Sequence, residues 1–373
     1  MSANSVSITN LTSRQLRELV VSLGEPEYRA KQLQHWVYQK LATSFDEMTD
    51  LPEAFRQKLA QKVKLQSLTP VDEVVGHDGT TKVLFALSDG KTIESVLMPY
   101  PTESGQCHYT VCISTQVGCP VGCPFCATGQ QGFERNLSPG EIIDQVLYFA
   151  RWLKGRGEQA NQITNLVFMG MGEPLANYDA LWQAIEVLNL PQGFELGARH
   201  MTVSTAGLVP QIRRLTREKL QIGLAISLHA GENALRNKLV PANKKYPLEE
   251  LIPVCREYCD KTGRRLSFEY ILFEGINDSL AQARSLARLL AGLNCHVNLI
   301  PANKTDEAKF KPPPRRKTLA FERELRRLGI ACTLRQKKGL DIEAGCGQLR
   351  SRFLQSGGKQ TSLKSACREE SDV

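Results

Sequence analysis

The sequence lacks any apolar run long enough to cross a membrane, because no stretch among its 373 residues approaches the roughly 20 apolar residues of a membrane helix. Residues 1–10 have neither the basic start nor the apolar core of a secretory signal. The segment from Cys367 to Val373 is not a prenylation motif. The sequence therefore predicts a cytoplasmic protein without a membrane partner, in a compartment that keeps thiols reduced.

The composition also lacks the biases of non-globular proteins. Its 42% hydrophobic and 23% charged residues exclude a fully disordered chain, a collagen and a coiled-coil rod. No internal repeat is evident at the periods of solenoid proteins. The length fits one large domain or two smaller ones.

Cysteine, by contrast, is abundant. The chain has eleven cysteines, and five of them lie between Cys107 and Cys126. In a reducing compartment such a cluster indicates metal binding or catalysis rather than disulfide bonds.

Positive charge is concentrated in one segment. From Lys304 to Arg352 the chain has 14 Lys and Arg against six Asp and Glu, and this excess equals the net charge of +8 of the whole chain. A basic surface of this kind attracts polyanions and indicates nucleic acid as a partner. Enhanced solubility is the alternative explanation.

Apolar residues recur at helical spacing in three stretches near the N-terminus, at Leu16–Leu23, Leu33–Leu41 and Phe55–Val63. They predict a small helical accessory domain over residues 1–66. This segment is rich in basic and aromatic residues, so docking of RNA is one possible role. Packing against the main domain is equally consistent with the pattern.

From residue 67 onward, strand patterns alternate with helical patterns. The strand patterns are Thr81–Ala86, Thr92–Met98, Tyr109–Ser114, Asn165–Met169, His200–Ser204, Gly223–Leu228, Leu266–Leu272, His296–Ile300 and Ala331–Leu334. Helical stretches between them include Gly140–Leu153, Tyr178–Leu188 and Leu280–Leu293. The alternation predicts an α/β fold with a parallel sheet, a partial or complete (β/α) barrel over residues 67–355. A disordered tail is expected over residues 356–373.

Small and polar residues follow several of these strands at their carboxyl ends. They include the segments Gly170–Pro174 and Ser204–Gly207, the segment Ser227–His229, and Asn303. Because barrels of this kind build their active sites at that end, these segments are candidate binding loops.

Cys119, Cys123 and Cys126 form the pattern C-x3-C-x2-C on a loop after a strand. Cysteines this close do not easily form disulfides. A structural zinc site normally takes four ligands, whereas three thiolates on a four-iron cluster leave one iron open to a substrate or cofactor. The spacing resembles the signature of the radical S-adenosylmethionine (SAM) superfamily, with structural zinc as the alternative.

Longer motifs narrow the resemblance. They are CISTQVGC (112–119), GQQGFERNL (129–137), GMGEPLAN (170–177), AISLHA (225–230), VNLIP (297–301) and AGCGQL (344–349). In this order they resemble the RlmN family, radical SAM enzymes that methylate carbon 2 of adenosine in 23S rRNA (adenosine 2503) and tRNA (adenosine 37). The alternative is the related Cfr type, which methylates carbon 8 of the same rRNA adenosine. The QGF-x-RNL string and the proline of GMGEP resemble RlmN more.

The resemblance implies a role for each matching residue. One 4Fe-4S cluster would be held by Cys119, Cys123 and Cys126. The SAM-contacting positions match Gly172, Glu173, Ser204, Ser227, Leu228, His229 and Asn303. The catalytic positions match Cys346 as the S-methylated cysteine, Cys112 as its resolving partner and Glu94 as the proton acceptor.

The implied reaction uses two SAM molecules per turnover, because carbon 2 of adenine is electron-poor and does not attack a methyl cation. The first SAM methylates the Cys346 thiolate. The second yields a 5′-deoxyadenosyl radical that activates this methyl group for addition to carbon 2. Cys112 then attacks the Cys346 sulfur, as in thiol–disulfide exchange, and releases the RNA. The resemblance thus implies a monomer whose partners are RNA, an electron donor and a disulfide reductant.

Several of these residues also fit ordinary structural roles. Alternation with apolar neighbours would place Glu94 on a solvated strand face, Cys112 fits a core position, and His229 fits a buried histidine. For the whole chain, an RNA-binding protein with a structural metal and no catalysis is a further alternative. The presence of both Cys112 and Cys346 argues against it, because a binding module needs neither.

Overall fold

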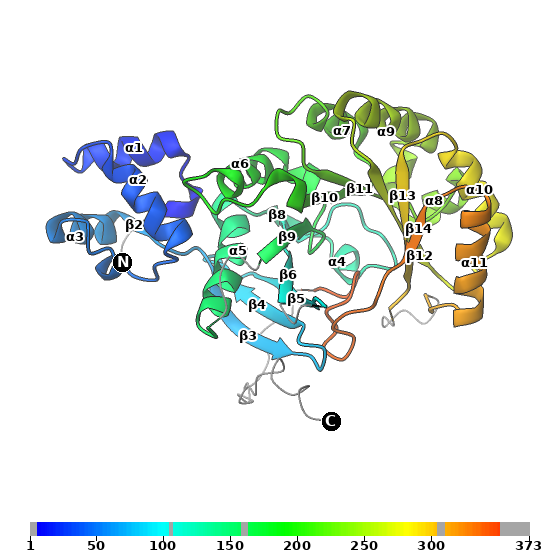
Figure 1. Ribbon diagram of the computed structural model, residues 1–373, viewed down its shortest axis with the longest axis horizontal. Helices are drawn as coiled ribbons and strands as arrows, with labels where there is room; N and C mark the ends of the chain where they lie inside the picture. The colour runs from blue at the N-terminus through cyan, green and yellow to red at the C-terminus, as the bar shows by residue number, and fades with distance from the viewer. Residues whose placement is uncertain (1–5, 104–106, 158–162, 304–309, 351–373) are drawn as a thin grey trace.

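The computed structural model describes most of the chain, in residues 6–103, 107–157, 163–303 and 310–350. The tail expected at 356–373 and parts of the basic segment Lys304–Arg352 lie outside the described residues. A group of N-terminal helices lies beside a larger body built around a sheet (Figure 1).

The N-terminal segment forms the three predicted helices. They are α1 (Ser13–Ser22), α2 (Arg29–Gln34) and α3 (Glu53–Lys62). α1 begins after Thr12, which forms a capping box with Gln15, and a π-helical turn over His35–Gln39 extends α2. Val63, expected in the third helix, instead begins β2 (Val63–Lys64), which pairs in parallel with β1 (Val6–Ser7). Short 3-10 helices lie at Ile8–Asn10 and Phe45–Glu47.

A ten-stranded sheet forms the main body, in the order β14-β13-β12-β11-β10-β9-β6-β5-β4-β3. Its parallel part comprises β6 (Cys107–Cys112), β9 (Ile163–Phe168), β10 (Met201–Thr205), β11 (Gly223–Ser227), β12 (Leu266–Leu272), β13 (Cys295–Pro301) and β14 (Cys332–Leu334). An antiparallel extension comprises β5 (Thr92–Pro101), β4 (Thr81–Ala86) and β3 (Thr69–Val75). Because the order ends at β14 and β3 without pairing them in the described chain, the predicted barrel is a partial one.

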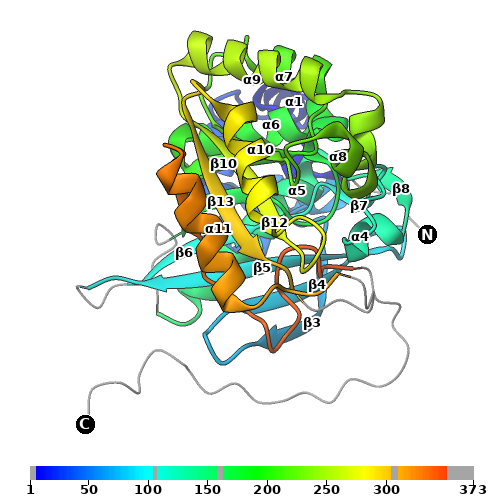
Figure 2. The ribbon, with the colours of Figure 1, turned by 90° about the vertical axis from the view of Figure 1, so that its right-hand side faces the viewer.

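Helices follow the parallel strands and lie on the outer side of the sheet (Figures 1 and 2). They are α5 (Pro139–Lys154), α6 (Tyr178–Asn189), α7 (Val209–Leu215), α8 (Asn233–Leu239), α9 (Leu248–Thr262), α10 (Leu280–Leu290) and α11 (Arg315–Arg327). Short 3-10 helices lie at Pro174–Asn177, Ala198–His200 and Pro241–Lys244. Ser138 and Glu141 form a capping box at the start of α5, and Gly263 ends α9 in the left-handed region at φ 65°.

A two-stranded ribbon was not anticipated from the sequence. β7 (Gln116–Gly118) pairs antiparallel with β8 (Phe133–Asn136), and the short helix α4 (Ala127–Gln130) lies between them. Gly118 needs its glycine, because its φ is +72° and a Cβ there would lie 1.8 Å from the Gly132 carbonyl oxygen. The ribbon therefore closes the base of the cysteine-bearing loop.

The N-terminal helices share the core of the main body, since one cluster of buried apolar side chains runs from Ile8 to Leu349. Polar contacts reinforce this packing. Asp144 of α5 accepts hydrogen bonds from the Thr9 hydroxyl (3.2 Å) and the Ser67 backbone N–H (2.6 Å). Arg151 donates to the backbone carbonyls of residues 41 and 42. The domain boundary between residues 66 and 67 remains a prediction. No helix in the described parts is long and apolar enough to span a membrane.

Candidate active site

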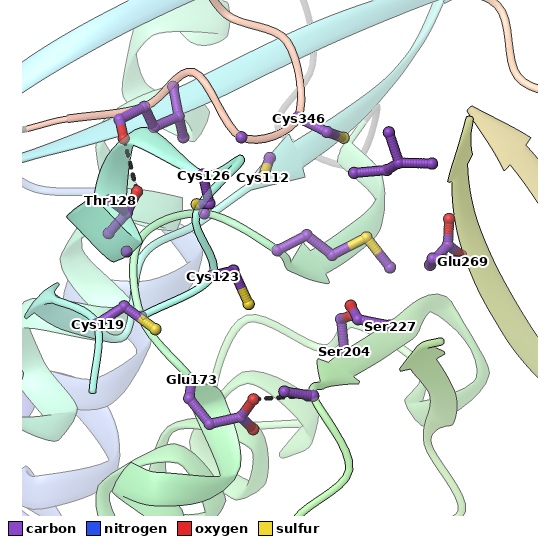
Figure 3. A pocket seen from close by; sticks show the side chains of 18 of the residues that line it. Cys112, Cys119, Cys123, Cys126, Thr128, Glu173, Ser204, Ser227, Glu269 and Cys346 are labelled. Atoms are coloured by element: carbon purple, nitrogen blue, oxygen red, sulfur yellow. Dashed lines mark hydrogen bonds between the residues drawn. The ribbon is translucent and has the colours of Figure 1, made fainter. Parts of the chain in front are cut away.

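A pocket opens at the carboxyl ends of the parallel strands, where the sequence places its candidate loops. Most of the predicted site residues line it: Cys112, Cys119, Cys123, Cys126, Gly172, Glu173, Ser204, Ser227, His229 and Cys346. Figure 3 shows the labelled side chains among them, such as those of Cys123, Ser204 and Cys346, converging from the cysteine loop, from strand ends and from a loop near the C-terminal end of the described chain. The predicted residues Glu94, Leu228 and Asn303 do not line this pocket.

Three thiols stand on one side of the pocket. The Cys119 N–H donates to the Gly132 carbonyl at 2.8 Å, and the Cys126 N–H donates to the Cys123 carbonyl at 3.1 Å. Gly129 of α4 packs on the same loop, because a Cβ there would lie 2.9 Å from both the N and the O of Cys123. The loop thus has a conformation set by backbone contacts, with all three thiols directed to one cavity.

The electrostatics of these thiols fit a metal cluster. Burial raises the pKa of Cys119 to about 12, and it also raises the pKa values of Cys123 and Cys126. Nearby negative charge raises these pKa values further: that of Glu173 and of the other loop thiols at Cys119 and Cys123, and that of Cys346 at Cys126. A cationic cluster would relieve this repulsion, which protons otherwise relieve. In the described chain no three ligating side chains surround a single-ion site. Ligands to separate irons of one cluster stand further apart, so the arrangement is compatible with a 4Fe-4S cluster.

Glu173 lies beside the thiols and is almost fully buried. Its carboxylate accepts hydrogen bonds from the backbone N–H of Ala206 (2.7 Å) and of Leu175 (3.1 Å). Burial raises the pKa of Glu173 to about 7. Gly172 precedes it with a φ of +106°, and a Cβ there would lie 2.7 Å from the Gln116 side chain. The segment is therefore a tightly packed turn that brings a poised carboxyl group to the pocket.

Two serines and a histidine come from the next strand ends. The hydroxyls of Ser204 and Ser227 lie 3.4 Å apart. His229 has a φ of +60°, and its Nδ1 accepts the Ile271 backbone N–H at 3.1 Å. Burial lowers the pKa of His229 to about 3, so the ring is neutral and its proton is on Nε2. His229 thus both satisfies the buried-histidine explanation and lines the pocket.

Leu228 and Asn303 support the pocket from outside its wall. Leu228 is fully buried, and its backbone N–H donates to the Glu269 carbonyl. Asn303 borders a smaller adjoining cavity together with Cys346, and its Nδ2 donates to the Cys346 carbonyl at 3.3 Å. The Oδ1 atom of Asn303 is buried without a hydrogen-bond partner in the described chain. This oxygen is therefore able to accept a hydrogen bond from a ligand.

Cys112 and Cys346 open into the same pocket, although they are far apart in the sequence (Figure 3). Burial, and then the nearby charge of Cys346, raises the pKa of Cys112 to about 12. Both are free thiols. The segment that carries Cys346 is held by the Gly347 carbonyl, which accepts the Ala127 N–H (2.8 Å), and by the Leu349 carbonyl, which accepts the Thr128 hydroxyl (2.6 Å).

The expectation of a solvated strand face for Glu94 is wrong. Glu94 is only 3% exposed, its Oε1 lies 3.4 Å from the Lys82 ammonium, and its Oε2 accepts the Arg350 backbone N–H at 2.9 Å. It is buried because the segment carrying Cys346 covers β5. Glu94 therefore stabilises this segment from behind the pocket wall.

Two charged residues on the pocket wall were missed in the sequence. Glu269 of β12 is buried and accepts a hydrogen bond from Asn298 through Oε1, whereas its Oε2 has no hydrogen-bond partner among the described residues. Burial raises its pKa. Arg335 directly follows β14 and lines both cavities, and the nearby charge of Cys346 raises its pKa. The sequence did contain a signal for Glu269, because it is the one acidic residue within the otherwise apolar run Phe268–Leu272.

The chain is similar to known proteins over both the N-terminal helices and the main body. A family model described as the ribosomal RNA large subunit methyltransferase N-terminal domain matches residues 6–65, and one described as the radical SAM superfamily matches residues 113–287. The chain is 46% identical to a "Probable dual-specificity RNA methyltransferase RlmN" of Geobacillus kaustophilus over 93% of each chain. It is 48% identical to a "Ribosomal RNA large subunit methyltransferase N" of Nitrosopumilus maritimus, covering 91% of this chain and 97% of the relative.

A solved structure agrees with these sequence matches. A radical SAM methyltransferase from Sphaerobacter thermophilus superposes with a TM-score of 0.88 at 50% identity, covering 92% of this chain and 99% of that chain. The similarity therefore includes the N-terminal helices as well as the sheet that carries the pocket.

Proposed function

This chain belongs to the RlmN family of radical SAM RNA methyltransferases, and we propose that it methylates carbon 2 of an adenosine in 23S rRNA and of an adenosine in tRNA. The observation that carries the proposal is the convergence of two free thiols, Cys112 and Cys346, on the pocket that the C-x3-C-x2-C loop borders. We further propose that the enzyme acts as a cytoplasmic monomer that depends on an external electron donor and a disulfide reductant.

Radical SAM enzymes use a 4Fe-4S cluster and SAM, which together supply a radical able to remove hydrogen from an unreactive C–H bond. Cys119, Cys123 and Cys126 would hold the cluster. The buried Glu173 carboxylate and the hydroxyls of Ser204 and Ser227 line the adjoining wall. They provide hydrogen-bonding groups for the ammonium and hydroxyl groups of SAM, with Gly172, Leu228, His229 and Asn303 shaping the site.

Cys346 is the proposed methyl carrier. Its thiolate would attack the methyl carbon of one SAM molecule, forming an S–C bond as S-adenosylhomocysteine leaves, and would hold the methyl group inside the pocket. Once one hydrogen atom has been removed from this methyl group, its carbon would form a bond to carbon 2 of the adenine while its bond to the Cys346 sulfur remains.

Cys112 is the proposed resolving residue. Its thiolate would attack the Cys346 sulfur, forming the S–S bond and breaking the S–C bond. The electron pair of that bond passes to the methylene carbon, which takes up a proton to become the methyl group. The resting pKa of about 12 means that Cys112 is protonated before reaction, so it must lose its proton in the adduct state.

Glu94 remains the proposed proton acceptor for the ring hydrogen. In the structure its Oε2 is bound to the Arg350 N–H, behind the segment that carries Cys346. Movement of that segment on RNA binding would break this hydrogen bond. Glu269 lines the pocket, and in the part of the chain that the structure describes its Oε2 has no partner, so it is the carboxylate against which the Glu94 assignment should be tested.

Mass spectrometry of nucleosides from a deletion strain tests the proposed position. Loss of 2-methyladenosine from both RNA classes, with recovery on complementation by the natural gene, is the expected result. Appearance of 8-methyladenosine on complementation would instead indicate the Cfr-type reaction. Unchanged nucleosides, together with cluster-free zinc in anaerobically prepared protein, would favour the non-catalytic RNA-binding alternative.

A further inference from the structure

Arg236 is the largest fully buried side chain in the described part of the protein. It lies on α8, and its guanidinium donates to the backbone carbonyls of Ala206 (2.7 Å), Ser227 (3.1 Å) and Leu228 (3.1 Å). A fourth hydrogen bond reaches the side-chain oxygen of Asn243 at 2.7 Å. All four acceptors are neutral, and no carboxylate interacts electrostatically with Arg236 within the described residues.

The position of this cation is directly behind the pocket wall. Ala206 and Ser227 line the pocket, and Leu228 precedes the pocket residue His229. The charge of Arg236 also interacts with the Cys123 thiol inside the pocket. Burial lowers the pKa of Arg236 only to about 10, so the guanidinium is charged at neutral pH.

A buried charge without an anionic partner is costly, and hydrogen bonds to neutral carbonyls compensate it only in part. The missing negative charge is available once the pocket is loaded, because three cysteine thiolates surround the cluster and a carboxylate enters with SAM. Positive charge near an iron–sulfur cluster stabilises its reduced form more than its oxidised form.

We propose that Arg236 is a positioning residue that serves the loaded pocket in two ways: its charge makes the cluster easier to reduce, and its hydrogen bonds hold the ends of β10 and β11 together. This inference rests on the cluster common to radical SAM enzymes and is independent of the RNA position proposed above.

The test compares three variants of the full-length, reconstituted protein without RNA. Arg236→Gln removes the charge, Arg236→Lys keeps it with fewer donors, and Asn243→Ala removes one neutral partner of the arginine. Arg151→Gln is the matched control, since Arg151 also donates to two backbone carbonyls but lies at the junction with the N-terminal helices. The readouts are the midpoint potential from an EPR-monitored redox titration, iron per chain, and the apo-protein melting temperature.

Arg236→Gln should shift the midpoint potential to a more negative value and lower iron retention, whereas Arg236→Lys should restore most of both. Asn243→Ala and Arg151→Gln should lower the melting temperature without changing the midpoint potential.

An unchanged midpoint potential in folded Arg236→Gln would overturn the proposal. An equal shift of the midpoint potential in Asn243→Ala would also overturn it. If Arg236→Gln does not fold, Arg236→Lys becomes the deciding variant. A midpoint potential of Arg236→Lys that falls together with its melting temperature, although the positive charge is retained, would refute the proposal. If the midpoint potentials change as expected but the natural protein does not methylate RNA, the result would count against the proposed function and not against the role of Arg236.

Discussion

The two sides of the pocket are built in different ways. The side formed by the strand ends has its groups fixed by buried hydrogen bonds, as at Glu173 and His229. The opposite side is the segment Gly339–Arg350, which contains no helix or strand and carries Cys346. Individual hydrogen bonds from separate elements hold this segment in place: from α4, from Glu94, from Asn303 and from residues 77 and 78. We call the strand-end side the rigid side, and it suits binding and cluster support, while the irregular segment suits the proposed role of Cys346, which would have to meet two reaction partners.

The strongest test of this division is to remove each of the two thiols. Cys346→Ala should abolish methylation and leave no protein–RNA adduct, because the methyl carrier is gone. Cys112→Ala should also abolish turnover but accumulate a covalent RNA adduct, since the thiolate that resolves it is missing. Denaturing gels followed by peptide mapping should place the link on Cys346. Normal turnover by Cys112→Ala, or a link on another cysteine, would refute the assignment.

On the rigid side, Glu173→Gln should weaken SAM binding by about 10- to 100-fold, since a charge-assisted hydrogen bond contributes roughly 1.5–3 kcal/mol. Equilibrium dialysis of the reconstituted protein measures this change. Glu269→Gln is the companion variant. If it weakens SAM binding and Glu173→Gln does not, the ammonium group lies at the other end of the pocket.

RNA docking is expected to involve the described part of the basic segment. Arg315 and Arg316 are exposed at the start of α11, whereas Lys317 is paired with Asp278 at 3.2 Å. Reversal of both arginines to Glu should weaken RNA binding about tenfold at low salt and flatten its salt dependence, because fewer counterions are released. Reversal of Arg199 and Lys219 to Glu, both exposed, is the charge-matched control. Equal effects of the two pairs would mean that net charge alone governs affinity.

Loosening the segment that carries Cys346 should have a smaller effect. Thr128→Val removes the hydroxyl bound to the Leu349 carbonyl and should slow methylation of Cys346 about fivefold, as expected for roughly 1 kcal/mol, with SAM affinity unchanged. Thr216→Val is the matched control, since Thr216 is also buried and donates to a carbonyl, that of Ile212 in α7. Radiolabelled methyl transfer to the protein measures both variants.

A separate test concerns pH and the rigid side in the apo protein. The pKa of Glu173 is about 7 in the folded chain and near its ordinary 4.5 when unfolded, so the folded state binds the proton more tightly between these values. Stability from this group is present below about pH 4.5 and is lost as pH rises toward 7, by up to about 3 kcal/mol. Urea unfolding at several pH values measures the free energy of unfolding, whose dependence on pH should differ between the natural chain and Glu173→Gln. Parallel pH profiles of the two proteins would show that the carboxyl group is not desolvated.

The sequence predicted the parallel strands and the cysteine loop well, because both depend on local patterns. The spacing of Cys119, Cys123 and Cys126 and the alternation of strands with helices are visible without tertiary information. The burial of Glu94 was not, because the covering segment lies some 250 residues further along the chain. For the same reason Glu269, Arg335 and Arg236 escaped notice, since only the folded sheet brings them to the pocket. The β7–β8 ribbon was missed because its strands are too short for a periodic signal.

The turn between β3 and β4 lies at the open edge of the sheet and contributes no reacting group, yet it contacts the segment that carries Cys346. The Asp78 carboxylate of that turn accepts the Gly339 N–H at 3.1 Å, and the Asp341 carboxylate accepts the His77 N–H at 2.9 Å. Both contacts fasten the beginning of the segment that carries Cys346 to residues 76–79. If Cys346 carries the methyl group as proposed, its displacement would pivot about this fastening point, and the turn would limit how far the methyl group could travel between its donor and its acceptor.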